Sequence, residues 1–179
     1  MLTGIVPPLV TPLTRSGEVD VDSIGSLVEH LVGAGVHGLF ALGSSGETAL
    51  LTDAMRLTAA RAVVEAAAGR VPVAVGAIEM TTLRAIESAR AATDLGASAV
   101  VVTAPFYTRT HPLEIADHFR RIAAAVQTPV YAYDIPVAVH TKLDHRMVLD
   151  LAADGVIAGL KDSSGDDVGL IARDSMIER

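Results

Sequence analysis

Short apolar runs alternate with longer segments of helical spacing along the whole chain. The runs centre near Ile5, Phe40, Ala74, Val101, Tyr131 and Ala158, at intervals of roughly thirty residues, the length of a strand plus its returning helix. Apolar strands that alternate with helices in this way indicate a parallel sheet. The pattern therefore predicts an α/β fold, and both a doubly wound open sheet and a (β/α)8 barrel fit it.

The same pattern predicts where individual elements begin and end. Six strands are expected at Gly4–Thr11, Gly38–Leu42, Val71–Gly76, Ala99–Thr103, Pro129–Tyr133 and Val156–Lys161. Helices are expected at Asp22–Ala34, Thr52–Ala68, Thr82–Leu95, Pro112–Val126 and Asp144–Ala152. Asp22 is the expected N-cap of the first helix, and Gly96 the residue that stops the third. Two prolines make the first strand irregular.

The last strand is the one on which the functional hypothesis depends. It is expected to be buried on both faces, and it ends in Lys161, one of only two lysines among fourteen basic residues. A lysine amine can lose its proton and attack a carbonyl, whereas a guanidinium stays protonated. A dry strand end would favour the neutral amine, so Lys161 is the candidate nucleophile. The alternative is a strand-terminal lysine that extends to solvent.

Other candidate residues follow the ends of the other expected strands. They are Thr11, Ser44, Ser45, the segment Thr103–Tyr107 and Tyr133. Reactive groups of parallel α/β folds collect at the carboxyl ends of the strands, so these residues should lie near Lys161. The set suits a 2-oxo acid, because hydroxyls can hold a carboxylate, an amine can attack a ketone and a phenol can transfer protons.

Composition narrows the possible partners. The chain has 179 residues, half of them apolar, a net charge of −7 and no cysteine. The acidic balance argues against nucleic acid and anionic membranes as partners, and the absence of cysteine excludes disulfides and thiolate metal sites. No signal peptide and no apolar run of membrane-spanning length is recognised, so a single soluble, cytoplasmic domain over residues 1–179 is expected.

Two other kinds of site are considered and set aside. No glycine-rich phosphate loop follows any expected strand, which weakens the nucleotide-binding open sheet. Asp134, His140 and His145 form the closest group of possible metal ligands, but their spacing matches no known ligand pattern, and the histidines are expected in loops or on helix surfaces. Neither a metal nor another cofactor is expected.

Four motifs in order resemble the dihydrodipicolinate synthase / N-acetylneuraminate lyase family of pyruvate-dependent class I aldolases. They are Gly43-Ser44-Ser45-Gly46-Glu47, Ala104-Pro105-Phe106-Tyr107, Tyr131-Ala132-Tyr133-Asp134-Ile135-Pro136 and Gly159-Leu160-Lys161-Asp162-Ser163-Ser164. Each is weak alone, but all four at strand ends with family-like intervals are specific. The resemblance runs from Gly4 to about Gly169 and implies a (β/α)8 barrel.

The resemblance also implies roles for individual residues. Lys161 would form an imine with pyruvate or a related 2-oxo acid, and no cofactor would be needed. Ser44 and Ser45 would hold the substrate carboxylate, with Ser44 in a proton relay, and Tyr133 would act as acid and base. Tyr107 would contribute its hydroxyl to the proton relay of a neighbouring subunit. The resemblance therefore implies a homo-oligomer, either a dimer or a tetramer.

Two departures from the family pattern qualify this interpretation. The synthases carry an arginine two residues after the proline of the Tyr-x-x-Pro segment, where Ala138 stands here, followed by Val139 and His140. This disfavours 4-hydroxy-tetrahydrodipicolinate synthase activity and favours a lyase for another 2-oxo acid, whose identity the rim Val137–Thr141 would determine. A barrel usually needs about 250 residues, so only about six of eight strand-helix units are expected. The chain is then a fragment, a frame-shifted product, a barrel completed by a partner, or a non-catalytic remnant.

Overall fold

Five parallel strands form one sheet in the computed structural model, which describes residues 2–166. They are β1 Leu39–Ala41, β2 Val73–Gly76, β3 Ala99–Thr103, β4 Val130–Asp134 and β5 Gly159–Asp162. The strands lie side by side in the order in which they occur in the sequence. A doubly wound sheet would reverse its strand order at a switch point, so this sequential order selects the barrel-type α/β fold.

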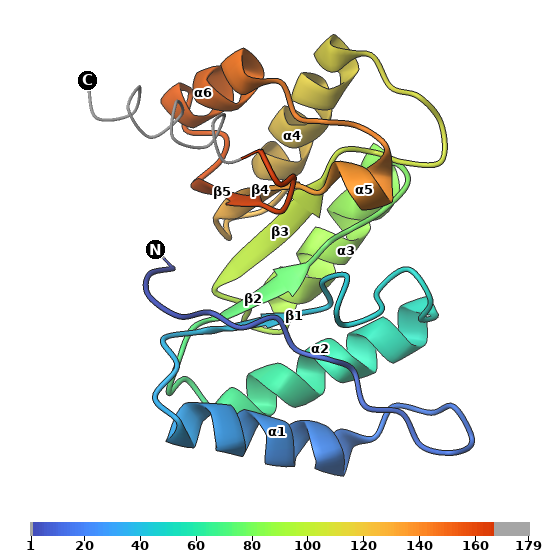
Figure 1. The fold of residues 1–179 in the computed structure, drawn as a ribbon, viewed down its shortest axis with the longest axis vertical. Helices are drawn as coiled ribbons and strands as arrows, with labels where there is room; N and C mark the ends of the chain where they lie inside the picture. The colour runs from blue at the N-terminus through green and yellow to red at the C-terminus, as the bar shows by residue number, and fades with distance from the viewer. Residues whose placement is uncertain (1, 167–179) are drawn as a thin grey trace.

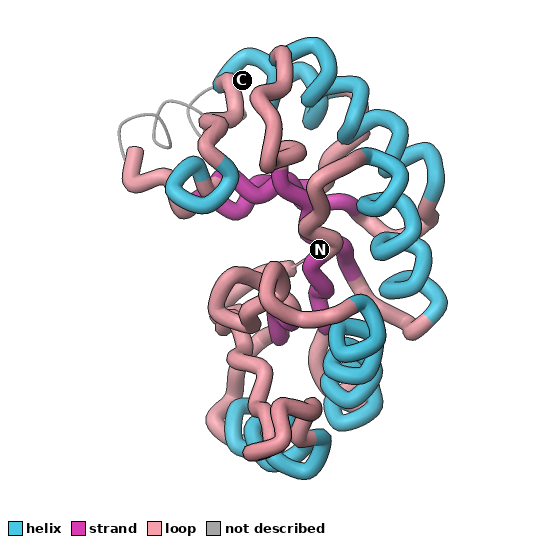
Figure 2. Tube along the Cα trace, turned by 90° about the vertical axis from the view of Figure 1, so that its right-hand side faces the viewer, coloured by secondary structure: helices cyan, strands magenta, loops and turns pink. Residues whose placement is uncertain are grey.

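The longer helices lie along the outer side of this sheet, which curves into an arc that leaves one side open (Figures 1 and 2). They are α1 Val21–Gly33, α2 Asp53–Ala67, α3 Thr82–Asp94, α4 Pro112–Ala125 and α6 His145–Ala153. A single turn of helix, α5 Pro136–Val139, follows β4, and its Val139 packs in the same apolar cluster as Tyr133. The single-turn helix α5 was not predicted, because four residues are too few to show helical periodicity. No helix within residues 2–166 is long and apolar enough to cross a bilayer.

Alternating strand residues build two apolar clusters on opposite faces of the sheet. On β3, Val100 and Val102 belong to the large core between the sheet and the helices. Val101, between them, belongs to a smaller cluster on the inner face, together with Phe40 and Tyr133. This alternation aims Tyr133 toward the inside of the arc.

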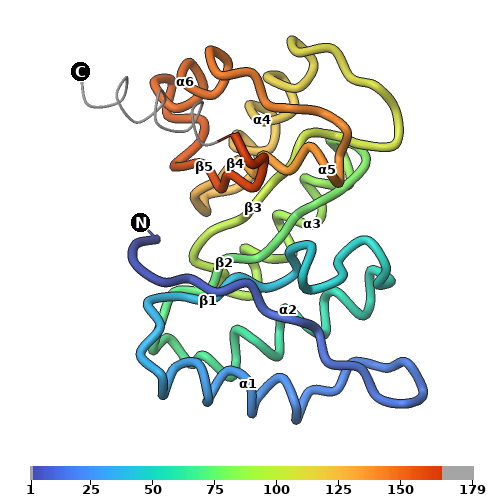
Figure 3. Tube along the Cα trace, viewed as in Figure 1, coloured from blue at the N-terminus to red at the C-terminus, as the bar shows by residue number. Residues whose placement is uncertain are grey.

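The prediction of a regular first strand at Gly4–Thr11 is wrong. Its segment still runs parallel to β1, joined by a single bridge between Pro8 and Phe40 (Figure 3). The Phe40 N–H donates to Pro7 O at 3.0 Å, and the Leu9 N–H donates to Phe40 O at 2.8 Å. Because Pro7 and Pro8 lack an N–H, the ladder cannot continue and no regular strand forms.

The predicted cap of the first helix is also wrong. Asp20 is the N-cap of α1, and its carboxylate accepts the Ser23 N–H at 3.0 Å. Asp22 lies inside the first turn, where an acidic side chain interacts favourably with the helix dipole. The end of α3 is close to the prediction: the helix stops at Asp94, and Gly96 adopts a φ of +89°, which glycine tolerates best.

The last strand is less buried than expected. All four residues of β5 are only partly buried. The reason is position, since β5 pairs with β4 alone and forms the edge of the sheet within the described residues. The contact with β4 is nevertheless close, because a Cβ added to Gly159 would lie 2.6 Å from the Tyr131 ring. Tyr131 packs on the inner face of the sheet.

One histidine contradicts the expectation of surface positions. His118 of α4 is 1% exposed, and its Nδ1 shares a hydrogen bond of 3.0 Å with the Thr82 hydroxyl of α3. Burial lowers the pKa of His118 to about 4, so the ring is neutral at physiological pH. His118 therefore acts as a packing residue between two helices.

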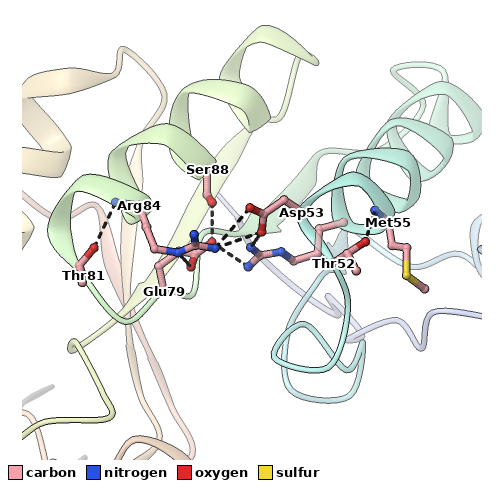
Figure 4. Close-up of polar contacts among 8 residues, drawn as sticks. Thr52, Asp53, Met55, Glu79, Thr81, Arg84 and Ser88 are labelled. Carbon is pink, nitrogen blue, oxygen red and sulfur yellow. Dashed lines mark hydrogen bonds and ion pairs between the residues drawn. The ribbon is translucent and has the colours of Figure 1, made fainter.

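A buried carboxylate joins the beginnings of α2 and α3 (Figure 4). Glu79, which follows β2, is 4% exposed and accepts hydrogen bonds from Arg84 Nε at 3.0 Å and Ser88 Oγ at 2.8 Å. Its second ion pair is with Arg56 of α2 at 2.7 Å. Arg56 and Arg84 both pair in addition with Asp53. These pairs hold the chain that leaves β2 against both helices.

Candidate active site

Neighbouring strand ends place Lys161 and Tyr133 together. The two are register partners across the β4–β5 pair, one residue before the ends of their strands. Ser44 comes from the loop that follows β1, on the same edge of the sheet. Residues from three separate segments thus meet at the carboxyl edge, as the strand pattern predicted.

A continuous series of contacts links these three side chains. The hydroxyls of Ser44 and Tyr133 share a hydrogen bond of 3.1 Å. The Lys161 amine lies 4.0 Å from the centre of the Tyr133 ring and donates to Ser163 Oγ at 2.9 Å. Within residues 2–166, Lys161 forms no ion pair with a carboxylate. Its amine therefore contacts hydroxyl and aromatic groups and remains half-buried at the inner face.

Tyr133 is placed in an environment that favours its ionised form. The phenol is 3% exposed, and burial by itself raises its pKa. Contacts with Ser44, Ser163 and Lys161 outweigh burial, so that the pKa of Tyr133 lies below its usual value of 10.0. Hydrogen bonds and a nearby cation both stabilise the phenolate, which is the condition for a phenol that transfers protons.

A cavity of about 180 Å³ opens beside this group. Ser44 and Tyr133 line it on one side, and Ala138 of α5 lines it as well. The rest of its lining is Glu47, Thr48, Ala49, Leu50, Ile78, Thr103, Phe106, Ile135 and Val139. No lysine, arginine or histidine of the described residues belongs to this lining, although the Lys161 amine lies close to the Tyr133 ring.

Two predicted residues are not part of the group within a single chain. Ser45 is exposed in the loop beside Ser44. Tyr107 is 89% exposed and adopts a φ of +82°, which is unusual for a residue with a side chain. Its side chain points away from the protein core and is available to another molecule. Among residues 2–166, no cluster of three potential metal ligands is found.

Two neighbours of the site were missed by the sequence analysis. Ser163 is the hydrogen-bond partner of Lys161, and Lys142 forms an ion pair with the fully buried Asp134 at 2.6 Å. Lys142 carried one available signal, since it is the other of the two lysines. Its partner could not be predicted, because the two residues meet through the fold of the loop around α5.

The sheet defines part of an α/β barrel, with a lysine, a tyrosine and a serine at its carboxyl edge. The sequence matches the dihydrodipicolinate synthetase family over residues 1–177, and the chain belongs to this family.

Individual relatives agree with this assignment. An uncharacterised DapA-like lyase from Halobacterium salinarum is 40% identical over 165 residues, which cover 92% of this chain and 54% of the relative. The 4-hydroxy-tetrahydrodipicolinate synthase of Phenylobacterium zucineum is 37% identical and is covered to 56%. The chain thus spans just over half the length of these relatives.

Solved structures show the same arrangement of elements. Dihydrodipicolinate synthase from Acinetobacter baumannii, solved with pyruvate, superposes with a TM-score of 0.96 at 29% identity, over 99% of this chain and 61% of its own. YagE from Escherichia coli K12, a prophage protein of the same family also solved with pyruvate, gives a TM-score of 0.94 at 31% identity, with the same coverage. The fold is therefore a partial (β/α)8 barrel, as the sequence predicted.

Proposed function

We propose that the chain carries the catalytic half of a Schiff-base-forming lyase that acts on pyruvate or a related 2-oxo acid. The observation that supports this most is the position of the Lys161 amine, 4.0 Å from the centre of the Tyr133 ring, in a member of this family. The pyruvate bound to two similar structures agrees with a 2-oxo acid as the substrate.

The proposed chemistry assigns one role to each of the predicted residues. The Lys161 amine attacks the ketone carbon of the 2-oxo acid, and loss of water gives an imine. The protonated imine accepts the electron pair of the carbon-carbon bond that breaks. For cleavage of a carbon-oxygen bond it accepts the pair of the neighbouring C–H bond as the proton is removed, and the hydroxyl then leaves, protonated, with the electron pair of the C–O bond. Tyr133 transfers the proton that this step requires, and its hydrogen bond to Ser44 stabilises the transient phenolate. Ser44 and Ser45 hold the substrate carboxylate.

The second substrate is proposed to lack a carboxylate at the rim of the cavity. Ala138 lines the cavity at the position where the synthases are expected to carry arginine. The alternative activity, 4-hydroxy-tetrahydrodipicolinate synthesis, would require a cation there. A lyase for another 2-oxo acid is therefore the preferred assignment, with the Val137–Thr141 segment and His140 at the rim.

A homo-oligomer is proposed to complete the proton relay. Tyr107 is 89% exposed, and the cavity beside Ser44 is open to a side chain from a second copy. In such an oligomer the exposed Tyr107 of one chain would contact the cavity of the other, as the family resemblance implies.

Borohydride trapping tests the proposed function. Pyruvate plus borohydride should add a stable mass to Lys161, located by peptide mass spectrometry, and Lys161→Ala should abolish the adduct. The second lysine, Lys142, serves as an internal control, because its amine is ion-paired and should remain unmodified.

Borohydride trapping combined with thermal unfolding distinguishes the enzyme from a non-catalytic remnant of the family. A protein that unfolds in one cooperative transition but leaves Lys161 unmodified would contradict the proposed lyase and favour the remnant. Aggregation, dye binding and the lack of any transition would show instead that the isolated half barrel is not a working fold.

A further inference from the structure

Lys142, the second lysine of the chain, lies in the loop between α5 and α6 and binds the ends of two strands (Figure 1). Its amine donates to Asp134 Oδ2 at 2.6 Å and to Ser164 Oγ at 2.7 Å. Asp162 and Asp166 lie 3.8 and 3.9 Å from the same nitrogen. One ammonium group therefore bridges the end of β4 and the turn that follows β5.

The two carboxylates at the strand ends need such a cation. Asp134 and Asp162 are register partners, and their side chains are 0% and 8% exposed. Like charges directly opposite each other on neighbouring strands are destabilising, and burial increases the cost. The Leu143 N–H satisfies one more oxygen of Asp134, and the Ser164 N–H one of Asp162. Lys142 supplies the positive charge that these hydrogen bonds do not.

This bridge lies one residue from the candidate catalytic pair. Tyr133 and Lys161 directly precede Asp134 and Asp162 in the same register. Successive strand residues point to opposite faces, so the carboxylate pair faces away from the site while the catalytic pair faces into it. Beyond β5 the pairing continues, because the Ser163 N–H donates to Asp134 O at 2.8 Å. Ser163 is also the residue that accepts a hydrogen bond from the Lys161 amine.

Within residues 2–166, β5 is the edge strand of the sheet, is partly exposed at every position and pairs with β4 alone. A short ladder and the Lys142 bridge both contribute to its position relative to Tyr133. Misplacement of a reacting group by about 1 Å can lower the rate about a hundredfold. Loss of the bridge is therefore expected to slow the reaction at Lys161.

We propose that Lys142 is a positioning residue for the candidate nucleophile. By joining Asp134 to Asp162 and Ser164, it holds the ends of β4 and β5 together so that the Lys161 amine stays over the Tyr133 ring. This inference rests on the proposed function for its effect on rate, but the structural effect can be measured without any reaction.

Lys142→Met tests the proposal in the full chain, with Lys142→Arg as the conservative variant. Borohydride trapping is followed at increasing pyruvate. The trapping rate at saturating pyruvate should fall about tenfold or more in Lys142→Met, while the half-saturating concentration stays the same, because the carboxylate-binding serines are untouched. Arg should restore most of the rate. A merely less stable protein would not be rescued in this way, and wild-type rates in Lys142→Met would overturn the proposal.

Arg146→Met is the matched control. It removes a nearby positive charge whose pair with Asp150 is exposed, at 77% and 51%, and it should leave trapping unchanged. An equal loss in this control would show that net charge, and not the bridge, is responsible, which would also overturn the proposal.

Lysine NMR separates failure of this proposal from failure of the proposed function. With ε-¹³C-lysine the chain gives two side-chain signals, and Lys142→Arg assigns them. The Lys161 signal should shift in Lys142→Met even if the wild type forms no adduct, and an unchanged signal contradicts the positioning role. If Lys142→Met does not fold, Asp162→Asn removes the negative charge of Asp162 from the bridge, leaves the contact between Lys142 and Ser164, and should shift the same signal.

Discussion

At the scale of single residues, the fold changes the acidity of Tyr133. Burial alone would make its phenol a weaker acid, but the contacts with Ser44, Ser163 and Lys161 act in the opposite direction and prevail. The sequence predicted an acid–base role for Tyr133 from its motif. It could not predict the direction of the pKa change, because that depends on side chains 89 positions before it and 28 after it along the chain.

Ser44→Ala should raise the pKa of Tyr133. The substitution removes the 3.1 Å hydrogen bond that stabilises the phenolate, while burial and Lys161 are unchanged. Ultraviolet difference titration can follow this, since the chain has only three tyrosines and no tryptophan. The tyrosine that ionises below its usual pKa should disappear in Tyr133→Phe and titrate at higher pH in Ser44→Ala. An identical titration curve in wild type and Ser44→Ala would contradict the assignment.

At the scale of elements, strands β3 and β4 and helices α2 to α4 follow the sequence prediction within one or two residues. Their apolar periodicity is strong, and packing on the sheet reinforces it. The irregular N-terminal segment and the short helix α5 were not predicted correctly. In both, proline geometry and tertiary contacts decide the structure, and neither leaves a periodic signal.

The ties between elements were not predictable either. Glu79 has no distinctive neighbours in the sequence, yet it is 4% exposed and bridges Arg56 of α2 and Arg84 of α3 (Figure 4). Its importance follows from burial, because a buried charge without a partner is costly.

Glu79→Ala should lower the free energy of unfolding by about 2–3 kcal/mol. This is less than for a fully buried pair, since Arg84 is 42% exposed and Asp53 remains as a partner for both arginines. Urea denaturation at neutral pH measures the change. Glu29→Ala is the control, because its pair with Arg70 is exposed, and it should cause only a small loss. Equal effects of the two substitutions would contradict the role assigned to Glu79.

At the scale of the whole molecule, the described residues form an open arc (Figure 2). Tyr133 of the candidate site packs on its inner face. Tyr107 is, with Ser45, one of the two predicted site residues that this arc does not bring to the others. Its 89% exposure is consistent with a contact between chains. The proposed role of Tyr107 therefore depends on the assembly of two chains, and mixtures of variant chains can test it.

Mixing two inactive variants should restore adduct formation if Tyr107 acts across a subunit contact. Tyr107→Phe retains Lys161, and Lys161→Ala retains Tyr107. In a mixed oligomer the tyrosine of one chain would serve the lysine of the other, and trapping should appear on the Tyr107→Phe chain. Mass spectrometry distinguishes the two chains. Adduct levels no higher than for Tyr107→Phe alone, in a preparation shown to exchange subunits, would contradict the cross-subunit relay.

The sequence by itself determined the class of fold, the strand ends that carry the candidate site and the identity of the candidate nucleophile. It could do so because strand and helix periodicities are local, and because one lysine at the end of an apolar strand is a local observation as well. The tertiary structure alone decided that β5 is a partly exposed edge, that Lys142 bridges Asp134 and Asp162, and that Tyr133 is more acidic than usual. These properties arise from contacts between segments far apart in the chain, and no pattern within a single segment encodes them.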